Sequence, residues 1–211
     1  VGGTCSFIGG GLCNNLLGCL STIGGGCLNS ITSYSSTISG GYCNVAKDIG
    51  WSFIGGGAAG TASGLGSVIC GGGYGALSGL ASNTASGGGS FIGGGHANTT
   101  SGYSFIGTGF QNISDGGTIV NADCSTAAFG SFIGTSSYSC SSVGSFIGTG
   151  LQNRVSGTYG ALVSGYQSVS SGQMSFIGAG LTLTSSGYYS FVGGGNNNSA
   201  TSTQSSIVGG G

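Results

Sequence analysis

The sequence predicts an all-β protein, a parallel β-solenoid of about 14 coils with one repeat of about 15 residues per coil. Three observations predict this fold. A Ser-Phe-Ile-Gly motif recurs along all 211 residues, 52 residues are glycine and none is proline, and each motif copy has an aliphatic third residue. Glycine at this frequency opposes a helix, because each interior glycine costs about 1 kcal/mol relative to alanine. The period is also too short for a propeller blade, which needs about 40 residues.

The motif occurs along the chain in verbatim and in degenerate copies. Verbatim copies begin at Ser6, Ser52, Ser90, Ser104, Ser131, Ser145 and Ser175. Degenerate copies begin at Ser21, Ser36, Ser67, Gly117, Gly160, Ser190 and Ser206. Only the interval from Ser67 to Ser90 is long, which indicates an insertion at about 71–86. We expect residues 1–211 to form a single repeat rod, on the order of 65 Å long at about 4.8 Å per coil.

The third motif position predicts the interior of the solenoid. Its residues are aliphatic and mostly β-branched, as expected for a buried strand position. We expect this core column to comprise Ile8, Ile23, Ile38, Ile54, Ile69, Ile92, Ile106, Ile119, Ile133, Ile147, Leu162, Ile177, Val192 and Val208.

The preceding position predicts an interface between copies of the chain. Because successive strand residues point to opposite faces, a buried aliphatic column leaves the phenylalanines outside. These are Phe7, Phe53, Phe91, Phe105, Phe132, Phe146, Phe176 and Phe191. Such a stripe is more apolar than monomers usually expose. We expect several rods to bury it side by side, most simply as a parallel homotrimer. The alternative is a wide solenoid with phenylalanine inside and the aliphatic column outside.

Two further signals predict the turns. Asparagine often stands eight residues after the motif serine, where it can cap a turn and form a ladder between stacked coils. This column comprises Asn14, Asn29, Asn44, Asn98, Asn112, Asn153 and Asn198. Ser-Gly pairs precede the next motif copy, as at Ser101-Gly102 and Ser186-Gly187, and indicate a second turn.

The repeat, read as Ser-Phe-Ile-Gly-Gly-Gly, then Asn, then Ser-Gly-Tyr, resembles the head repeats of trimeric autotransporter adhesins. It is also similar to repeats of phage tail fibres and other virion-surface fibres. The resemblance covers nearly the whole chain and implies a left-handed parallel β-roll that trimerises into a surface rod for adhesion or display. The cysteines, the phenylalanines in place of small residues, and the lack of a stalk or membrane anchor depart from the adhesin pattern.

The sequence contains very few residues with a charged side chain. The charged residues are Lys47, Asp48, Asp115, Asp123 and Arg154, and His96 is the one histidine. We therefore expect no enzyme, no cofactor and no metal site, since acid–base and metal chemistry draw on these residue types. Two cations cannot neutralise a useful number of phosphates, so we expect no nucleic-acid partner. No apolar run is long enough for a membrane-spanning helix.

The eight cysteines leave two readings open. Cys5 and Cys19, like Cys13 and Cys27, stand in nearly the same column of adjacent coils and could form disulfides. Disulfides would indicate an oxidising, extracellular setting. Alternatively, the cysteines are reduced and fill space as small apolar residues.

Three functions remain as hypotheses. The first is a structural rod of a fibre on a cell or virion surface; because the chain starts at Val1 and stops at Gly211 in mid-coil, we expect it to be part of a longer fibre. The second is a module that binds a host receptor or glycan through the insertion or the tyrosine-rich turns at Tyr103, Tyr159, Tyr188 and Tyr189. The third is an ice-binding solenoid, which would need a regular threonine column.

Overall fold

The computed structural model describes residues 2–73 and 82–211. These residues form 27 short strands and no helix. The fold is an all-β parallel β-solenoid of about 13 turns, with about 15 residues per turn, which confirms the predicted fold class. The number of turns is 13 rather than 14 because the last motif copy contributes only its first strand. The chain has two compact units, Val1–Gln111 and Asn112–Gly211.

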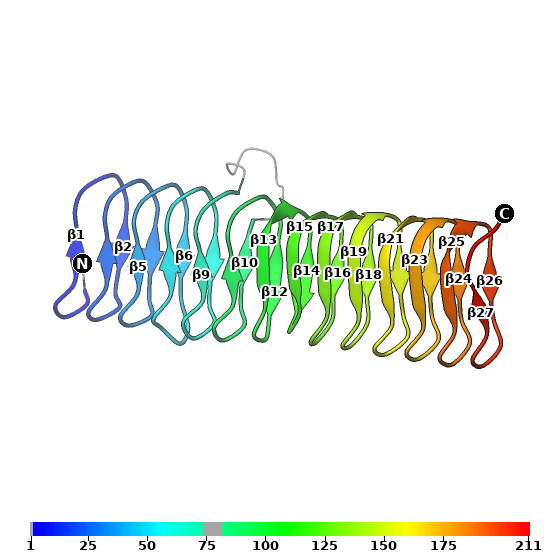
Figure 1. The fold of residues 1–211 in the computed structure, drawn as a ribbon. Helices are drawn as coiled ribbons and strands as arrows, with labels where there is room; N and C mark the ends of the chain where they lie inside the picture. Colours follow the sequence, from blue (N-terminus) through cyan, green and yellow to red (C-terminus); the bar gives the residue numbers. More distant parts are fainter. Residues whose placement is uncertain (1, 74–81) are drawn as a thin grey trace. The chain divides into compact units, whose positions relative to one another are not determined.

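In the first unit, alternate strands belong to two parallel sheets, which we call the odd sheet and the even sheet after the strand numbers (Figure 1). The odd sheet orders as β1 (Phe7–Ile8), β3 (Thr22–Ile23), β5 (Thr37–Ile38), β7 (Phe53–Ile54), β9 (Val68–Ile69), β11 (Phe91–Ile92) and β13 (Phe105–Phe110). The even sheet orders as β2 (Asn15–Leu16), β4 (Ser30–Ile31), β6 (Val45–Ala46), β8 (Thr61–Ala62), β10 (Thr84–Ala85) and β12 (Thr99–Ser101).

The second unit repeats this alternation with longer odd strands. Its odd sheet orders as β15 (Thr118–Asp123), β17 (Phe132–Ser137), β19 (Phe146–Leu151), β21 (Ala161–Tyr166), β23 (Phe176–Leu181), β25 (Phe191–Asn196) and β27 (Ser206–Ile207). Its even sheet orders as β14 (Ile113–Asp115), β16 (Thr126–Ala127), β18 (Cys140–Ser141), β20 (Arg154–Val155), β22 (Val169–Ser170), β24 (Thr184–Ser185) and β26 (Ser199–Ala200).

The odd sheet turns its aliphatic column inward. Neighbouring strands pair motif residue with motif residue, as Ile133 does with Ile147, so the column continues from coil to coil. Twelve of its fourteen predicted members are fully or almost fully buried, from Ile23 to Val192. Each such burial contributes about 1.5–3 kcal/mol to stability. Ile8, on the first strand, is half-buried.

The prediction for the last member of this column, Val208, is wrong. Val208 is 84% exposed. β27 continues the 15-residue spacing, so Val192 pairs with Ile207, and Ser205 takes the place of the motif serine instead of Ser206. The sequence Ser-Ile-Val-Gly resembles the motif, but it lies one residue further along the chain than the strand pairing requires. Pairing with the preceding coil decides the register.

The even sheet contributes smaller side chains to the interior. Its inward residues are apolar in the first coils, where Leu16 and Ile31 are fully buried. In the second unit several are serines, and their hydroxyls bond motif serines across the interior. Ser170 Oγ lies 2.6 Å from Ser175 Oγ, and Ser185 Oγ lies 2.7 Å from Ser190 Oγ. These pairs satisfy polar groups that would otherwise destabilise the core.

The insertion is narrower than predicted. Thr84 and Ala85 form a regular strand that pairs with β8 and β12, so residues 82–86 belong to an ordinary coil. Asn83 is almost fully buried and joins the asparagine column, which the sequence analysis missed because it counted from the motif serine across the insertion. Residues 74–81 lie outside the described residues.

Candidate functional site: the outer face of the odd sheet

The phenylalanine column lies on the outer face of the odd sheet, opposite the buried aliphatic column. Phe105 is 40% exposed and Phe146 is 39% exposed. Neighbouring rings stack nearly parallel, with centroids 5.0 Å apart for Phe91 and Phe105 and 5.4 Å apart for Phe132 and Phe146. All eight predicted members are exposed or half-buried: Phe7, Phe53, Phe91, Phe105, Phe132, Phe146, Phe176 and Phe191.

The column is interrupted by smaller residues. In the first unit Thr22, Thr37 and Val68 take the phenylalanine position, and in the second unit Thr118 and Ala161 do so. The rings therefore stand in stacked groups with gaps between them. On this face of each unit, the large phenylalanine rings therefore stand beside positions with smaller side chains.

A glycine two residues after the phenylalanine makes room for the ring. A β-carbon at Gly93 would lie 3.3 Å from Phe91 Cε1, and one at Gly148 would lie 3.3 Å from Phe146 Cε1. The ring therefore lies over the bare backbone of its own strand. The same β-carbons would lie closer still to the backbone of the next coil, at Gly107 O and Val163 O, so the ring and the neighbouring backbone both favour glycine after Phe-Ile.

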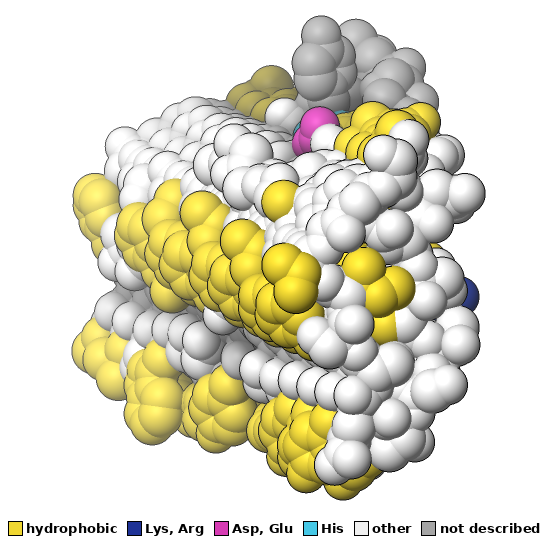
Figure 2. Space-filling model, turned by 45° about the vertical axis from the view of Figure 1, so that its right-hand side comes forward, with side chains coloured by type: hydrophobic (Ala, Val, Ile, Leu, Met, Phe, Trp, Pro, Cys, Tyr) yellow, Lys and Arg dark blue, Asp and Glu magenta, His cyan; other side chains and the backbone are white. Residues whose placement is uncertain are grey.

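A second apolar column runs beside the first, and the sequence analysis missed it. In the second unit it consists of Leu151, Tyr166 and Leu181, which pair in register and are each about two-fifths exposed. Leu12, Cys27, Tyr42 and Ala58 occupy the equivalent position in the first unit. The signal was available in the sequence as the residue five positions after the phenylalanine. Figure 2 shows hydrophobic side chains gathered in rows, separated by other side chains and backbone.

The aromatic residues of the second turn are among the most exposed hydrophobic side chains of each unit. Tyr103 is 83% exposed and Phe129 is 69% exposed. Their rings cover left-handed glycines of the neighbouring coil: a β-carbon at Gly144 would lie 2.7 Å from Tyr159 Cδ1. A hydrogen bond with the neighbouring Tyr189 raises the pKa of Tyr188, whose ring meets Tyr189 edge-on at 4.2 Å.

The predicted asparagine column forms a buried ladder at the first turn. Asn29 Nδ2 donates to Gly25 O and to Gly41 O, both at 3.0 Å, and Asn29 Oδ1 accepts from Asn44 N at 3.0 Å. One amide therefore closes the turn of its own coil and ties it to the next coil. Equivalent contacts are made by Asn14, Asn44, Asn83, Asn98 and Asn153. Asn112 is fully buried, and its Oδ1 accepts from Ser125 N at 3.0 Å. Asn198 Nδ2 donates to Gly194 O and Gly210 O.

The predicted disulfides do not form. All eight cysteines are free thiols. Cys5 lies one residue out of step with Cys19, because Phe7 pairs with Thr22 and Cys5 therefore stands beside Leu20. Likewise, Cys27 pairs with Leu12 instead of Cys13.

The titratable groups of the described residues form no recognisable metal centre. Among them, no three His, Cys, Asp or Glu side chains come together in an arrangement that could hold a metal ion. The His96 ring stacks on Phe110 with centroids 5.6 Å apart. A hydrogen bond with Cys43 raises the pKa of Tyr42, with a smaller effect from Cys27. No helix that could cross a membrane occurs in residues 2–73 and 82–211.

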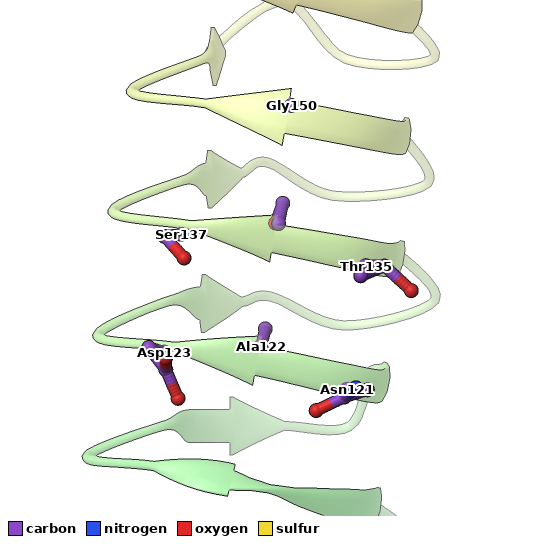
Figure 3. A pocket seen from close by; sticks show the side chains of 7 residues that line it. Asn121, Ala122, Asp123, Thr135, Ser137 and Gly150 are labelled. Carbon is purple, nitrogen blue, oxygen red and sulfur yellow. The ribbon is translucent and has the colours of Figure 1, made fainter.

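The second unit also has one shallow polar hollow, of about 240 Å³. It lies across three odd strands, with Asn121 and Asp123 on β15, Thr135 and Ser137 on β17, and Gly150 on β19 (Figure 3). Ala122 and Ser136 complete its lining. It was not predicted, because these residues come together only through the register of the coils.

Comparison with known proteins does not assign the chain to a family. No protein-family model matches the chain, and no curated protein matches it. The structure therefore defines the chain as a parallel β-solenoid with repeats of about 15 residues.

Proposed function

We propose that this chain is a structural repeat rod of a fibre at a cell or virion surface, and that it supports attachment or display instead of catalysis. Its repeats resemble those of trimeric adhesin heads and of phage and virus fibres, and we propose an extracellular setting on that resemblance. The observation that carries the proposal is the repeated use of the same contacts in successive coils. The buried aliphatic column and the motif serines recur within each unit, and asparagine or serine side chains link most neighbouring coils at the first turn.

Such a construction favours a mechanical role. Each coil is tied to its neighbours by backbone hydrogen bonds and by a buried side-chain ladder, so extension along the coil axis adds stability coil by coil. Acid–base chemistry draws on charged side chains, and the chain has only five of them.

The exposed phenylalanine stripe supports assembly into a parallel homotrimer. Stacked rings that are about two-fifths exposed, in line on one sheet face, are typical of an interface between subunits. Cyclic packing of three copies would bury the same stripe on each of them.

Light scattering tests this proposal directly. We expect a solution mass near 60 kDa, three times the chain mass of 20.0 kDa, with and without reductant. Negative-stain electron microscopy should show rods of constant width. A solution mass of 20.0 kDa, that of a monomer, would contradict the proposed trimer. Globular particles would contradict the proposed rod.

A second candidate is adhesion to a host receptor or glycan through the aromatic turns. The exposure of Tyr103, Phe129 and Tyr159 favours it, since exposed aromatic rings commonly carry binding energy. Replacing Tyr103 and Tyr159 by serine should then abolish attachment to host cells while leaving the solution mass unchanged. Unchanged attachment would remove this candidate.

Ice binding remains as a minor candidate. It would need a long, regular threonine column, and the longest such run in the described residues has three members: Thr61, Thr84 and Thr99 on the even sheet. A thermal-hysteresis assay without activity would remove it.

A further inference from the structure

Three asparagines stand in the Asn-x-Ser/Thr pattern that accepts N-linked glycans: Asn98, Asn112 and Asn197. The sugar replaces one hydrogen on the side-chain amide nitrogen, and the attached glycan is bulky and needs solvent around it. The surroundings of each amide in the folded chain therefore decide which of the three asparagines can carry a glycan.

The first pattern lies inside the solenoid. Asn98 and the hydroxyl residue of its pattern, Thr100, are both fully buried. Asn98 Nδ2 donates to Gly94 O at 3.0 Å and to Gly109 O at 2.9 Å, so both of its N–H groups are already used. A sugar on this nitrogen would remove a ladder hydrogen bond and would have no space.

The second pattern is equally closed. Asn112 and the hydroxyl residue of its pattern, Ser114, are fully buried. Asn112 Nδ2 donates to Ala122 O, and Asn112 Oδ1 accepts from Ser125 N at 3.0 Å. The folded coil therefore excludes a glycan here as well.

The third pattern is open to solvent. Asn197 and Ser199 are both exposed. Asn197 follows β25 at the first turn, with a φ of 57°, a left-handed conformation that asparagine tolerates. Its backbone N–H donates to Leu181 O at 2.9 Å, whereas the ladder contacts of this coil are made by the next residue, Asn198. The Asn197 amide is thus outside the ladder.

The exposure of Asn197 belongs to its position in the turn. Gln152, Gln167 and Thr182 occupy the same position in the three preceding coils, with φ of 57°, 53° and 54°. All three are exposed although coils lie on both sides of them. The side chain at this position therefore points to solvent in each of these coils.

The site is also separate from the phenylalanine stripe. Phe191 begins β25 and Asn196 ends it, which places them about 16 Å apart along the strand at ~3.3 Å per residue. Asn197 lies beyond that end, at the turn toward β26. A glycan on Asn197 therefore does not cover the stripe that we propose as the subunit interface.

We propose that Asn197 is the acceptor of a single N-linked glycan. The donor is an activated sugar diphosphate, lipid-linked or nucleotide-linked. Asn197 Nδ2 attacks C1 of the sugar, the N–C1 bond forms and the bond from C1 to the phosphate oxygen breaks. The amide proton passes to a base of the transferase, and the diphosphate leaves with its carrier. The modification rests on the proposed extracellular setting, because a chain meets donor and transferase on its way to the surface.

Secretion of the whole chain from insect cells behind a cleavable leader tests the proposal. Intact-mass spectrometry should show the loss of one glycan on treatment with peptide N-glycosidase F. Peptide mapping should show that this treatment converts Asn197, and neither Asn98 nor Asn112, to aspartate. Asn197→Gln and Ser199→Ala should each abolish the loss of mass.

Matched variants test the role of the turn position. Asn196→Gln changes an exposed neighbour outside the pattern and should retain the glycan. Thr182→Asn, made in the Asn197→Gln chain, completes the pattern one coil earlier with Thr184 and should restore one glycan. Failure to restore it would overturn the structural argument. Circular dichroism should show every variant folded, since glutamine already occupies this turn position in two coils.

The proposal is wrong if the secreted chain carries no glycan, if the sugar lies on Asn98 or Asn112, or if it survives Asn197→Gln. If the chain is not secreted, the folded chain purified from bacteria decides the question: with a soluble N-glycosyltransferase and UDP-glucose it should gain glucose on Asn197 alone. None of these results depends on the solution mass. A monomer would therefore contradict the trimer and leave the acceptor site in place, and an unglycosylated trimer would do the reverse.

Discussion

Asn29 occupies the space that a side chain on Gly26 would need. A β-carbon at Gly26 would lie 2.7 Å from Asn29 Nδ2, and the same conflict links Gly11 to Asn14 and Gly41 to Asn44. At Ser125 and Ser139, where the asparagine column has a serine instead, the residue three positions earlier has a side chain, whereas Ser168 still follows Gly165. The third motif glycine and the asparagine therefore form one structural unit.

Replacing that glycine by alanine should destabilise the coil. Gly26 has a φ of 89°, a conformation that L-residues rarely adopt, and its added β-carbon would also meet Gly41 O. We expect Gly26→Ala to lower the free energy of unfolding by at least about 2 kcal/mol. Urea denaturation followed by circular dichroism measures it.

The adjacent glycine provides the control. No atom lies within 4 Å of a β-carbon placed at Gly25. Gly25→Ala should therefore change stability by less than about 0.5 kcal/mol. Equal effects of the two substitutions would show that the asparagine contact does not set the glycine requirement.

Removing a ladder amide should be costly as well. Asn29→Ala deletes two donated hydrogen bonds and the acceptor of Asn44 N, all in a fully buried position. At about 1–3 kcal/mol for each buried group left unsatisfied, we expect a loss of about 3 kcal/mol or more in the free energy of unfolding. Asn15→Ala, at an exposed position of β2, should have almost no effect, and a similar loss there would argue against the ladder.

The phenylalanine stripe makes a prediction about assembly. Phe132→Ser combined with Phe146→Ser removes a stacked, partly exposed pair without touching the buried column. We expect the solution mass to fall from about 60 kDa to the 20.0 kDa of one chain, measured by light scattering. Phe129→Ser combined with Tyr159→Ser removes equally large rings from the second turn and should leave the mass unchanged. If only the turn variant dissociates into single chains, the interface between subunits lies at the turns.

The cysteines should react as free thiols, and the rate of their reaction should increase with their exposure to solvent. Cys5, Cys13, Cys19, Cys70 and Cys140 are exposed, whereas Cys27, Cys43 and Cys124 are half-buried. Under native conditions N-ethylmaleimide should modify the exposed five first, as followed by mass spectrometry. Reductant should change neither the mass nor the thermal midpoint. Protection of Cys5 together with Cys19 until reductant is added would contradict the free-thiol structure.

Several features were predictable because they follow from local periodicity. Alternation of side chains along a strand placed Phe146 outside once Ile147 was inside. The tendency of asparagine to cap turns placed Asn29 and Asn44 in one ladder. Each of these inferences needed only the repeat and the geometry of a single strand.

Errors arose where one residue of register decided the outcome. Cys5 and Cys19 are one position out of step, and Val208 matched the motif although the half-buried Ile207 pairs with Val192. A shift of one residue turns a strand side chain to the opposite face, and motif letters alone do not detect it.

The sequence by itself determined the solenoid, its aliphatic interior and its asparagine turns, because the residues that form them recur at a regular spacing along the chain. Only the tertiary structure decided which residues of different coils meet. The second apolar column of Leu151 and Tyr166 and the polar hollow lined by Asp123 and Thr135 arise from pairing between coils. That pairing depends on the length of every intervening turn, which no single repeat specifies.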